Sequence, residues 1–553
     1  MAITSLDKQI TFSRWVKYSY KLLLLDDNDI VVDEIESVES FGNVSVDGTS
    51  SRRRSYSFTM HVTNKNMSAS ERSRMWMNKR VRFQLGIITP RLDDYKYYNL
   101  GMFVITDTSS QFSSEDNSIS VNCNDYFSML DGTQNGSLNA ITTTIPAYEE
   151  NEDGTVKKYN IIRNALISTI TQLGGIKNYM IDDIGEANGM AEFNDDYLDY
   201  REKHPTWNVV PYDLEYSAGD TVSSIIDGLT NLYPNYDSAF NEDGLFVTRL
   251  IPSCYDDPIS ITNEDIQNFF VSESTSLDYS SVRNVVHVWG QAFDVEHFSE
   301  TVTNSNSVYS TSIESYGNKY VSGDLIAIKV PTTNSPTQYI NINNIGNVQI
   351  YDEYKDTPLA ASTLIAGQIY VFKCRPIYNG ETVKRFYLQG QWQAHGLIAL
   401  VDGSESNERY KCSDGTITTL YTKKYFQDKY GVDNVRLKVI KDSPFTVQKL
   451  GERVDIKSGD EYDNITSDSL AIQRAEYELY VDARLTDNIT VEINRLVPWL
   501  KEYMKVSYIK QNDTEEKQYI TDQISLNLDE GTTSMTMHTF YPLYDFVEKR
   551  RTK

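Results

Sequence analysis

The sequence predicts a mainly β protein with some α-helix, an α+β chain built of several domains. Its 553 residues are too many for one hydrophobic core, and three to five domains are expected. Its 39 tyrosines outnumber phenylalanine and tryptophan together, and aromatic side chains, with many Thr, Val and Ile, favour strands. Apolar and polar residues also alternate along many short segments, as they do in half-buried antiparallel strands.

The clearest pair of strands lies in residues 97–132, YYNLGMFVITDTSSQFSSEDNSISVNCNDYFSMLDG. The first strand is predicted to place three apolar residues on one face: Leu100, Met102 and Val104. The second strand alternates three apolar residues with serine and asparagine: Ile119, Val121 and Cys123. The polar linker between the strands is long for a tight hairpin, so part of it is expected to extend them.

Residues 1–132 are predicted to form one β-domain around this pair. Ser68 and Glu71 have the spacing of a capping box, which predicts a short helix. Further strands are expected at four places: 13–25, 29–40, 51–62 and 80–87. Three consecutive arginines lie at the start of the third strand: Arg52, Arg53 and Arg54. They have two interpretations, a solvated strand entrance or an ion-pairing contact with a neighbouring subunit.

Residues 133–210 are predicted to form a mixed α/β connector. Apolar residues at helical spacing predict a helix over 159–173. Gly174 and Gly175 are expected to end it, because glycine tolerates the left-handed conformation of a C-terminal cap. The acidic segment 182–203 is expected to be a loop.

Residues 211–304 are predicted to be part of a second β-domain with a helix. Asp220 or Thr221 is expected to cap that helix. Two short strands should follow, joined by a turn at Asn241–Gly244, and then a strand over 283–289.

Residues 305–402 are predicted to be an inserted small β-sandwich, because polar linkers rich in Ser and Asn flank them. Residues 403–553 are predicted to be an α+β part that completes the core. A helix of about four turns is expected there, with three residues on one face: Ala471, Ala475 and Leu479. Strands are expected after it, and their apolar residues are Ile489, Val491, Ile493, Ile524, Leu526, Leu528, Met535 and Met537.

Three parts of the chain resemble baseplate hub proteins of tailed phages, also called tail-associated or tail-tip proteins. Residues 97–132 carry the pattern aromatic-x-x-Leu-Gly-x-Phe-Val-Ile-x-Asp, then Cys-x-Asp-Tyr-Phe-x-x-Leu-Asp-Gly. The helix, hairpin and strand of 211–304 are similar to the same family. So are the Ser-Pro-Phe segment, Ala-rich helix and closing strands of 403–553. The insert 305–402 resembles small β-sandwich modules of phage tail fibres.

The resemblance implies a structural virion protein, the central hub of a phage or phage-like tail, with tail-tube-like β-domains. It implies a homotrimer that links the tail tube to the distal tip or spike and lines the channel for DNA. The implied partners are other copies of the chain, the tail tube or distal tail protein, the tip or spike protein and the tape-measure protein. The protein would be made in the cytoplasm of the host bacterium and reside in the virion. Two alternatives stay open: a receptor-binding protein whose insert engages a host surface glycan, and a tail-associated cell-wall hydrolase.

No catalytic, cofactor-binding or metal-binding residue is predicted, and the chain is not expected to be an enzyme. It has no phosphate loop, nucleophile elbow or zinc-protease helix, and it is expected to end too soon for a C-terminal lytic domain. Residues 26–29 resemble the start of a calcium loop but lack its central Gly and closing Glu, and a hairpin tip is predicted. With 78 acidic residues, a hydrolytic carboxylate pair stays open. The histidines are not at ligand spacing, and three are expected to face solvent or to be hydrogen-bonded: His61, His287 and His538.

Composition limits the partners further. A formal charge of −26 argues against stable nucleic-acid binding, which needs clustered Lys and Arg. Neither a transmembrane segment nor a signal peptide is predicted. The cysteines lie far apart and are expected to be free thiols from a reducing cytoplasm: Cys123, Cys254, Cys374 and Cys412.

Overall fold

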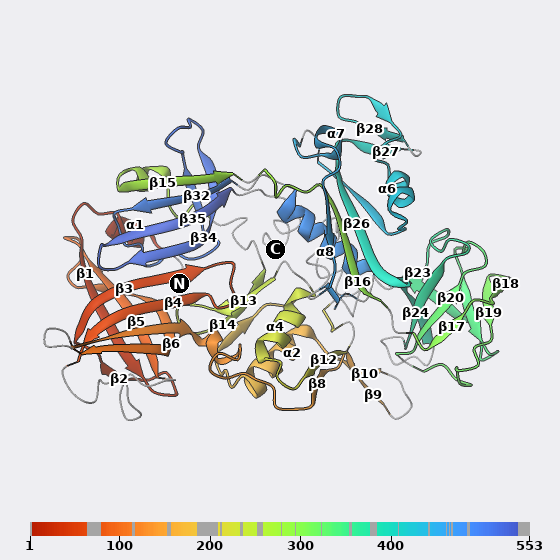
Figure 1. Cartoon of the computed structure of the whole chain (residues 1–553), viewed down its shortest axis with the longest axis horizontal. Helices are drawn as coiled ribbons and strands as arrows, with labels where there is room; N and C mark the ends of the chain where they lie inside the picture. The colour runs from red at the N-terminus through yellow and green to blue at the C-terminus, as the bar shows by residue number, and fades with distance from the viewer. Residues whose placement is uncertain are drawn as a thin grey trace.

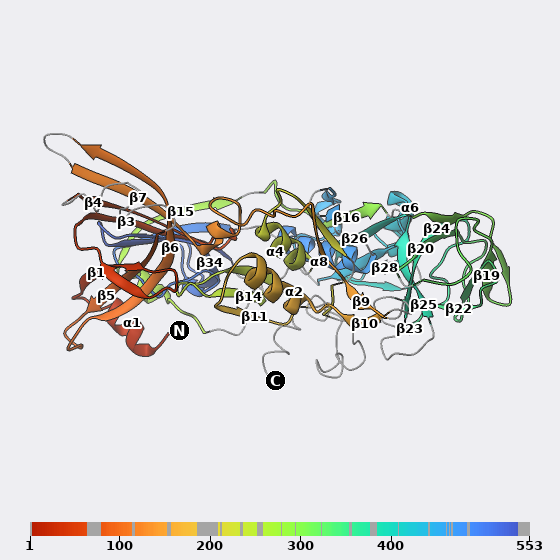
Figure 2. The same cartoon turned by 90° about the horizontal axis from the view of Figure 1, so that it is seen from below.

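The architecture is mainly β with a few helices, as predicted, and the strands form several sheets along an elongated molecule (Figures 1 and 2). The computed structural model describes residues 3–539 apart from these gaps: 63–78, 113–116, 152–155, 185–207, 211–212, 233–235, 251–257, 278, 293–294, 322, 353–356, 377–383, 407–408, 441–442, 460–461, 464, 466–467 and 484–486. The predicted helix near Ser68 and the acidic segment after 184 lie outside the described residues. Among the described helices, none is long and apolar enough to cross a membrane.

A twelve-stranded sheet joins the two ends of the sequence at one end of the molecule (Figure 1). Strands from the first 125 residues meet the last strands through β3 and β34, where Val44 pairs with Leu526. Helices α1 (Ser5–Thr11) and α5 (Asn263–Gln267) lie beside it. Its strands are β1 (Lys17–Leu25), β2 (Val31–Glu34), β3 (Val38–Asp47), β4 (Arg54–His61), β5 (Arg80–Ile88), β6 (Lys96–Phe112), β7 (Asn117–Asp125), β15 (Phe270–Leu277), β32 (Asp487–Ile493), β33 (Lys505–Tyr508), β34 (Lys517–Asn527) and β35 (Thr532–Thr539).

The alternation predicted for β7 is confirmed, because Ile119, Val121 and Cys123 are buried and Ser120 and Asn122 between them are exposed. In β5, Val81, Phe83 and Leu85 are buried and the residues between them are half-buried. One detail of β6 is wrong. Leu100 does not share a face with Met102 and Val104, but packs in a different hydrophobic cluster. The physical reason is a bulge: the pairing of β5 with β6 skips Leu100, and an extra residue moves the following side chains to the other face.

The centre of the molecule holds two helices and a small three-stranded sheet (Figure 1). As predicted, Thr221 caps α4 (Val222–Asn231) by accepting a hydrogen bond from the backbone N–H of Ser224. Gly244 has a φ of +70° in the turn that joins β13 (Tyr236–Phe240) to β14 (Phe246–Leu250), also as predicted. The other elements are β8 (Thr142–Ile145), β9 (Tyr148–Glu150), β10 (Val156–Tyr159), α2 (Ile162–Ser168), the π-helical turn Thr169–Leu173, β11 (Tyr179–Ile181) and β12 (Leu214–Ser217).

A four-stranded sheet with α8 (Asp468–Asp482) across one face forms the next layer. The predicted helix face is confirmed, since Ala471, Ala475 and Leu479 are buried against this sheet. A Cβ on Gly396 would lie 2.5 Å from the backbone nitrogen of Ile472, so only glycine lets helix and strand approach this closely. The strands in order are β30 (Val435–Val439), β26 (Gln393–Val401), β16 (Val285–Ala292) and β31 (Val454–Lys457). Its other face is covered by β27 (Ser404–Ser406), β28 (Arg409–Lys411), β29 (Ile417–Thr418), α6 (Lys423–Tyr430) and α7 (Val447–Leu450).

Nine strands between β16 and β26 form a separate body around one hydrophobic core, which we call the module (residues 297–391). It lies at the opposite end of the long axis from the twelve-stranded sheet (Figures 1 and 2). Ala292 and Gln393 are paired across β16 and β26, so the chain enters and leaves the module at neighbouring positions. The strands are β17 (His297–Ser299), β18 (Thr303–Ser305), β19 (Val308–Thr311), β20 (Leu325–Lys329), β21 (Tyr339–Ile342), β22 (Val348–Asp352), β23 (Thr357–Pro358), β24 (Ile369–Pro376) and β25 (Lys384–Gln391).

Candidate functional site

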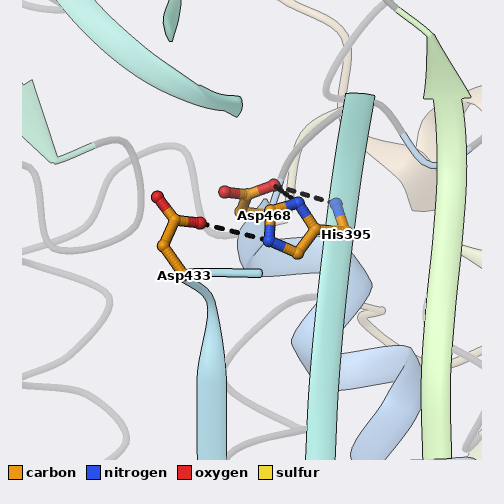
Figure 3. A group of neighbouring side chains, drawn as sticks. All are labelled: His395, Asp433 and Asp468. Atoms are coloured by element: carbon orange, nitrogen blue, oxygen red, sulfur yellow. Dashed lines mark hydrogen bonds and ion pairs between the residues drawn. The ribbon is translucent and has the colours of Figure 1, made fainter. Parts of the chain in front are cut away.

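A buried histidine and two aspartates meet where the module joins the four-stranded sheet (Figure 3). His395 is the third residue of β26, directly after the chain leaves the module. Asp433 lies in the loop between α6 and β30, and Asp468 is the first residue of α8. Three elements distant in sequence therefore place one titratable side chain each in the same spot.

Each aspartate approaches a different nitrogen of the imidazole ring (Figure 3). Asp433 Oδ1 lies 3.1 Å from Nε2, and Asp468 Oδ1 lies 3.7 Å from Nδ1. Asp468 Oδ1 also accepts a hydrogen bond of 2.9 Å from the backbone N–H of His395. The Asn434 side chain donates to the backbone oxygens of His395 and Asp468, which fixes the loop against both elements.

Burial and charge act against each other at this site. Burial alone lowers the pKa of His395, but the hydrogen bond to Asp433 and the charges of Asp468 and Asp433 outweigh it, and the pKa is raised. Burial raises the pKa of Asp468 to about 7, although the positive charge of His395 opposes the shift. A protonated imidazole with two N–H donors suits the two carboxylates.

The expectation that His287 faces solvent or is hydrogen-bonded is wrong: its side chain is buried, with 3% exposed, and its buried Nε2 has no hydrogen-bond partner among the described residues. The sheet that holds β16 is covered on both faces, so side chains on either side of this strand point into a packed layer. Burial, and then the charge of His395, lowers the pKa of His287 to about 4. This shift favours the neutral form of His287. His61 is exposed, and His538 makes a 2.6 Å hydrogen bond to Asp522, as expected.

The three side chains are close enough to suggest a cation site, with donor atoms within 4.8 Å of one another. Their arrangement favours a proton instead. Asp433 faces Nε2 and Asp468 faces Nδ1, on opposite sides of one imidazole ring. A single metal ion bound to Nε2 would therefore lie on the far side of the ring from the Asp468 oxygen that faces Nδ1. The Nδ1 atom also lies 3.2 Å from the backbone oxygen of Gln393, which suits an N–H donor.

A second charged cluster corrects both interpretations of the basic tripeptide. The Arg53 and Arg54 side chains are almost completely buried, so neither is solvated nor available to a neighbouring subunit. Arg53 pairs with Asp237 of β13, and Glu502 lies 3.3 Å from Arg54 and 2.8 Å from Arg249 of β14. The hairpin β13–β14 packs on the start of β4 and covers these arginines. Arg52 is half-exposed and pairs with Asp131 within the chain.

The remaining predicted positions are ordinary structural features. Residues 26–29 form the tip between β1 and β2, where Asp29 pairs with Arg80 at 2.8 Å. Cys123, Cys374 and Cys412 are free, whereas Cys254 lies outside the described residues. No signal in the sequence pointed to His395, because its partners lie in separate elements.

A family model described as "Domain of unknown function (DUF5048)" matches residues 442–544, the region of α8 and β32–β35. None of the curated proteins matches the chain.

Solved structures with a similar arrangement include tail proteins of three bacteria or their prophages. One is the tail protein from Neisseria meningitidis MC58, with 9% identity, a TM-score of 0.42, and coverage of 95% of this chain and 98% of that one. A second is the prophage MuSo2 43 kDa tail protein from Shewanella oneidensis, with 7% identity, a TM-score of 0.40 and coverage of 95% and 98%. A third is the prophage tail protein gp18 from Listeria monocytogenes EGD-e, with 8% identity, a TM-score of 0.38 and coverage of 96% and 98%.

Proposed function

We propose that this chain is a structural protein of a phage or phage-like tail, and within it the hub that links the tail tube to the distal tip or spike. The sequence resemblance in 97–132, 211–304 and 403–553 supports this class, and the three solved structures named above are tail proteins. The chain would be made in the host cytoplasm, reside in the virion and have no catalytic activity of its own. Its partners would be the tube or distal tail protein, the tip protein and the tape-measure protein.

The observation that carries the proposal is the twelve-stranded sheet, whose two edge strands among the described residues carry exposed apolar side chains. One edge is β2, where Val31 and Val32 are 44% and 57% exposed. The other is β15, where Val271 and Leu277 are 48% and 44% exposed. An exposed edge strand offers unpaired backbone groups to another chain, and monomeric proteins usually protect such edges with charge or cover.

Two different edges on one sheet favour a head-to-tail contact, β2 of one copy against β15 of the next. Contacts of this kind close into a ring when the rotation between copies fits. The resemblance to baseplate hub proteins implies a ring of three copies, a homotrimer. Its twelve-stranded sheets would then line a common channel below the tail tube.

Particle mass tests the proposal directly. We expect the purified chain, alone or with its tube partner, to give a mass of three copies in light scattering. A charge on each edge, Val32→Lys with Val271→Lys, should shift the mass towards one copy. Ile417→Lys is the matched control, because Ile417 is 64% exposed but lies on the small sheet of β27–β29. A stable monomer in the presence of tail partners would contradict the hub assignment.

The alternative is receptor binding through the module, and one observation favours it. Phe298 and Trp392 are 37% and 43% exposed, and their rings pack edge to face with centroids 5.8 Å apart. Exposed aromatic rings can stack on sugar faces. Saturable binding of host cell-wall glycan that Trp392→Ala abolishes would support this role alongside the hub role.

A further inference from the structure

The base of the module rests on the aspartates that flank His395. The Tyr370 hydroxyl of β24 donates to Asp433 Oδ2 at 3.0 Å and accepts a 3.1 Å hydrogen bond from the backbone N–H of Ile365. At the end of β25, a Cβ on Gly390 would lie 2.3 Å from Asp468 Oδ1, so the module backbone touches this carboxylate. Each aspartate therefore contacts the module on one side and His395 on the other.

His395 holds these two contacts together. Its side chain is 1% exposed, and each ring nitrogen faces one carboxylate. Asp433 Oδ1 is itself buried, with His395 Nε2 as its charged neighbour. Without a proton on Nε2, its lone pair would face the Asp433 oxygen at 3.1 Å in a buried site, which is unfavourable, and only a long 3.4 Å hydrogen bond from the backbone N–H of Asn434 would offset it.

We propose that His395, Asp433 and Asp468 form a protonation-dependent lock that fixes the module on the four-stranded sheet. The imidazolium lies between the two aspartates, with Nε2 paired to Asp433 and Nδ1 beside Asp468, and it holds the loop of Asp433 and the start of α8 against the module base. Loss of one proton leaves a neutral ring with a single N–H, which ends the charge pairing with the aspartates and loosens the joint. The inference does not depend on the hub assignment.

The sign of the pH dependence follows from the groups that face His395. Because folding raises the pKa of His395, protonation of this side chain stabilises the folded protein. That stabilisation is fully present below the pKa of the unfolded state and is lost as the pH rises through the pKa of the folded state. The pKa of Asp468, raised by burial to about 7, acts in the same direction, because ionising a buried carboxyl costs stability. His287 of β16 stays neutral, and burial raises the pKa of Tyr370 out of the relevant range. The lock is therefore tightest at mildly acidic pH and weakens above neutrality.

Hydrogen exchange on the full chain tests the lock. Protection factors, corrected for intrinsic exchange at each pH, are measured at about pH 6 and about pH 8.5 for the peptides around residues 389–397 and 431–437. We expect protection in these peptides to fall severalfold between the two conditions. Peptides of β5, in the twelve-stranded sheet, should show no change and serve as the internal reference.

Variants separate the lock from a general effect of pH. His395→Gln should reduce the pH dependence at the joint to the part that Asp468 contributes, whereas the exposed His61→Gln should retain it in full. If His395→Gln fails to fold, Asp468→Asn keeps the shape of the side chain and should reduce the dependence. An unchanged dependence in both variants would overturn the proposal. So would protection gained on adding Mn²⁺ or Zn²⁺ and lost with His395→Gln, because that result would identify a cation site.

Discussion

Glu502 lies where three arginine side chains converge, and its own side chain is only 6% exposed. Burial by itself raises the pKa of a carboxyl, but the charges of Arg54, Arg249 and Arg53 outweigh it and hold the pKa of Glu502 at about 2. The residue thereby ties the hairpin β13–β14 to the start of β4. At the scale of single residues, buried charged side chains hold separate elements together in two places, the Glu502 cluster and the His395 cluster.

We expect Glu502→Gln to destabilise the twelve-stranded sheet and its hairpin. Removing Glu502 leaves this buried cluster of arginines short of one counter-charge, and breaking a buried ion pair in this way costs about 3–5 kcal/mol. Thermal unfolding followed by circular dichroism measures the loss, and the exposed Glu300→Gln should leave the midpoint unchanged.

The pH dependence of the same pair of variants gives a second readout. Folding lowers the pKa of Glu502 from about 4.5 to about 2, so the ionised side chain stabilises the folded protein. This stabilisation is fully present above pH about 4.5 and is lost as the pH falls towards about 2. The difference in stability between wild type and Glu502→Gln should therefore shrink in acid. A difference that stays constant from neutral pH to pH about 3 would contradict the ion-pair explanation.

At the scale of elements, strand pairing bears on where the inserted module ends. The sequence suggested 305–402, but β26 within that range is a central strand of the four-stranded sheet and pairs with β16 and β30. The module core contains residues from 302 to 386. We therefore propose residues 293–392 as the separable unit, with the domain division elsewhere as predicted from the sequence.

Deleting 293–392 and joining Ala292 to Gln393 through a short Gly/Ser turn should leave the rest of the chain folded. These two residues are cross-strand partners, so a hairpin turn can replace the module without moving either strand. Cooperative unfolding of the remainder by differential scanning calorimetry checks the outcome. Deleting 305–402 is the control, and it should abolish folding of the four-stranded sheet because it removes β26.

At the scale of the whole molecule, the excess of negative charge acquires a role if three copies enclose a channel. DNA carries one negative charge per roughly 1.7 Å of duplex, so basic walls would retain it. The field of wall charges reaches only about 8 Å at physiological salt, so the carboxylates must line the channel itself. The competing explanation is that the charge of −26 only keeps the chain soluble before assembly.

We expect channel-facing residues of the assembled tip to be mostly Asp, Glu, Ser, Thr and Asn. Electron cryomicroscopy of the assembled tip shows which side chains face the channel. A channel ringed by Lys and Arg, or a single copy without a channel, would contradict the expectation.

The sequence by itself determined the class of fold and most of its elements, because these depend on local signals. The alternation in β5 and β7, the apolar face of α8, the cap at Thr221 and the turn at Gly244 all follow from neighbouring residues. Only the tertiary structure decided which charges are buried, since Arg53 and Arg54 are covered by a hairpin almost two hundred residues away. It also decided the face of Leu100, because a bulge depends on the partner strand. The cluster of His395, Asp433 and Asp468 was also decided only by the tertiary structure. Three elements that are distant in sequence bring these side chains together, and a local sequence pattern does not indicate which elements will pack against one another.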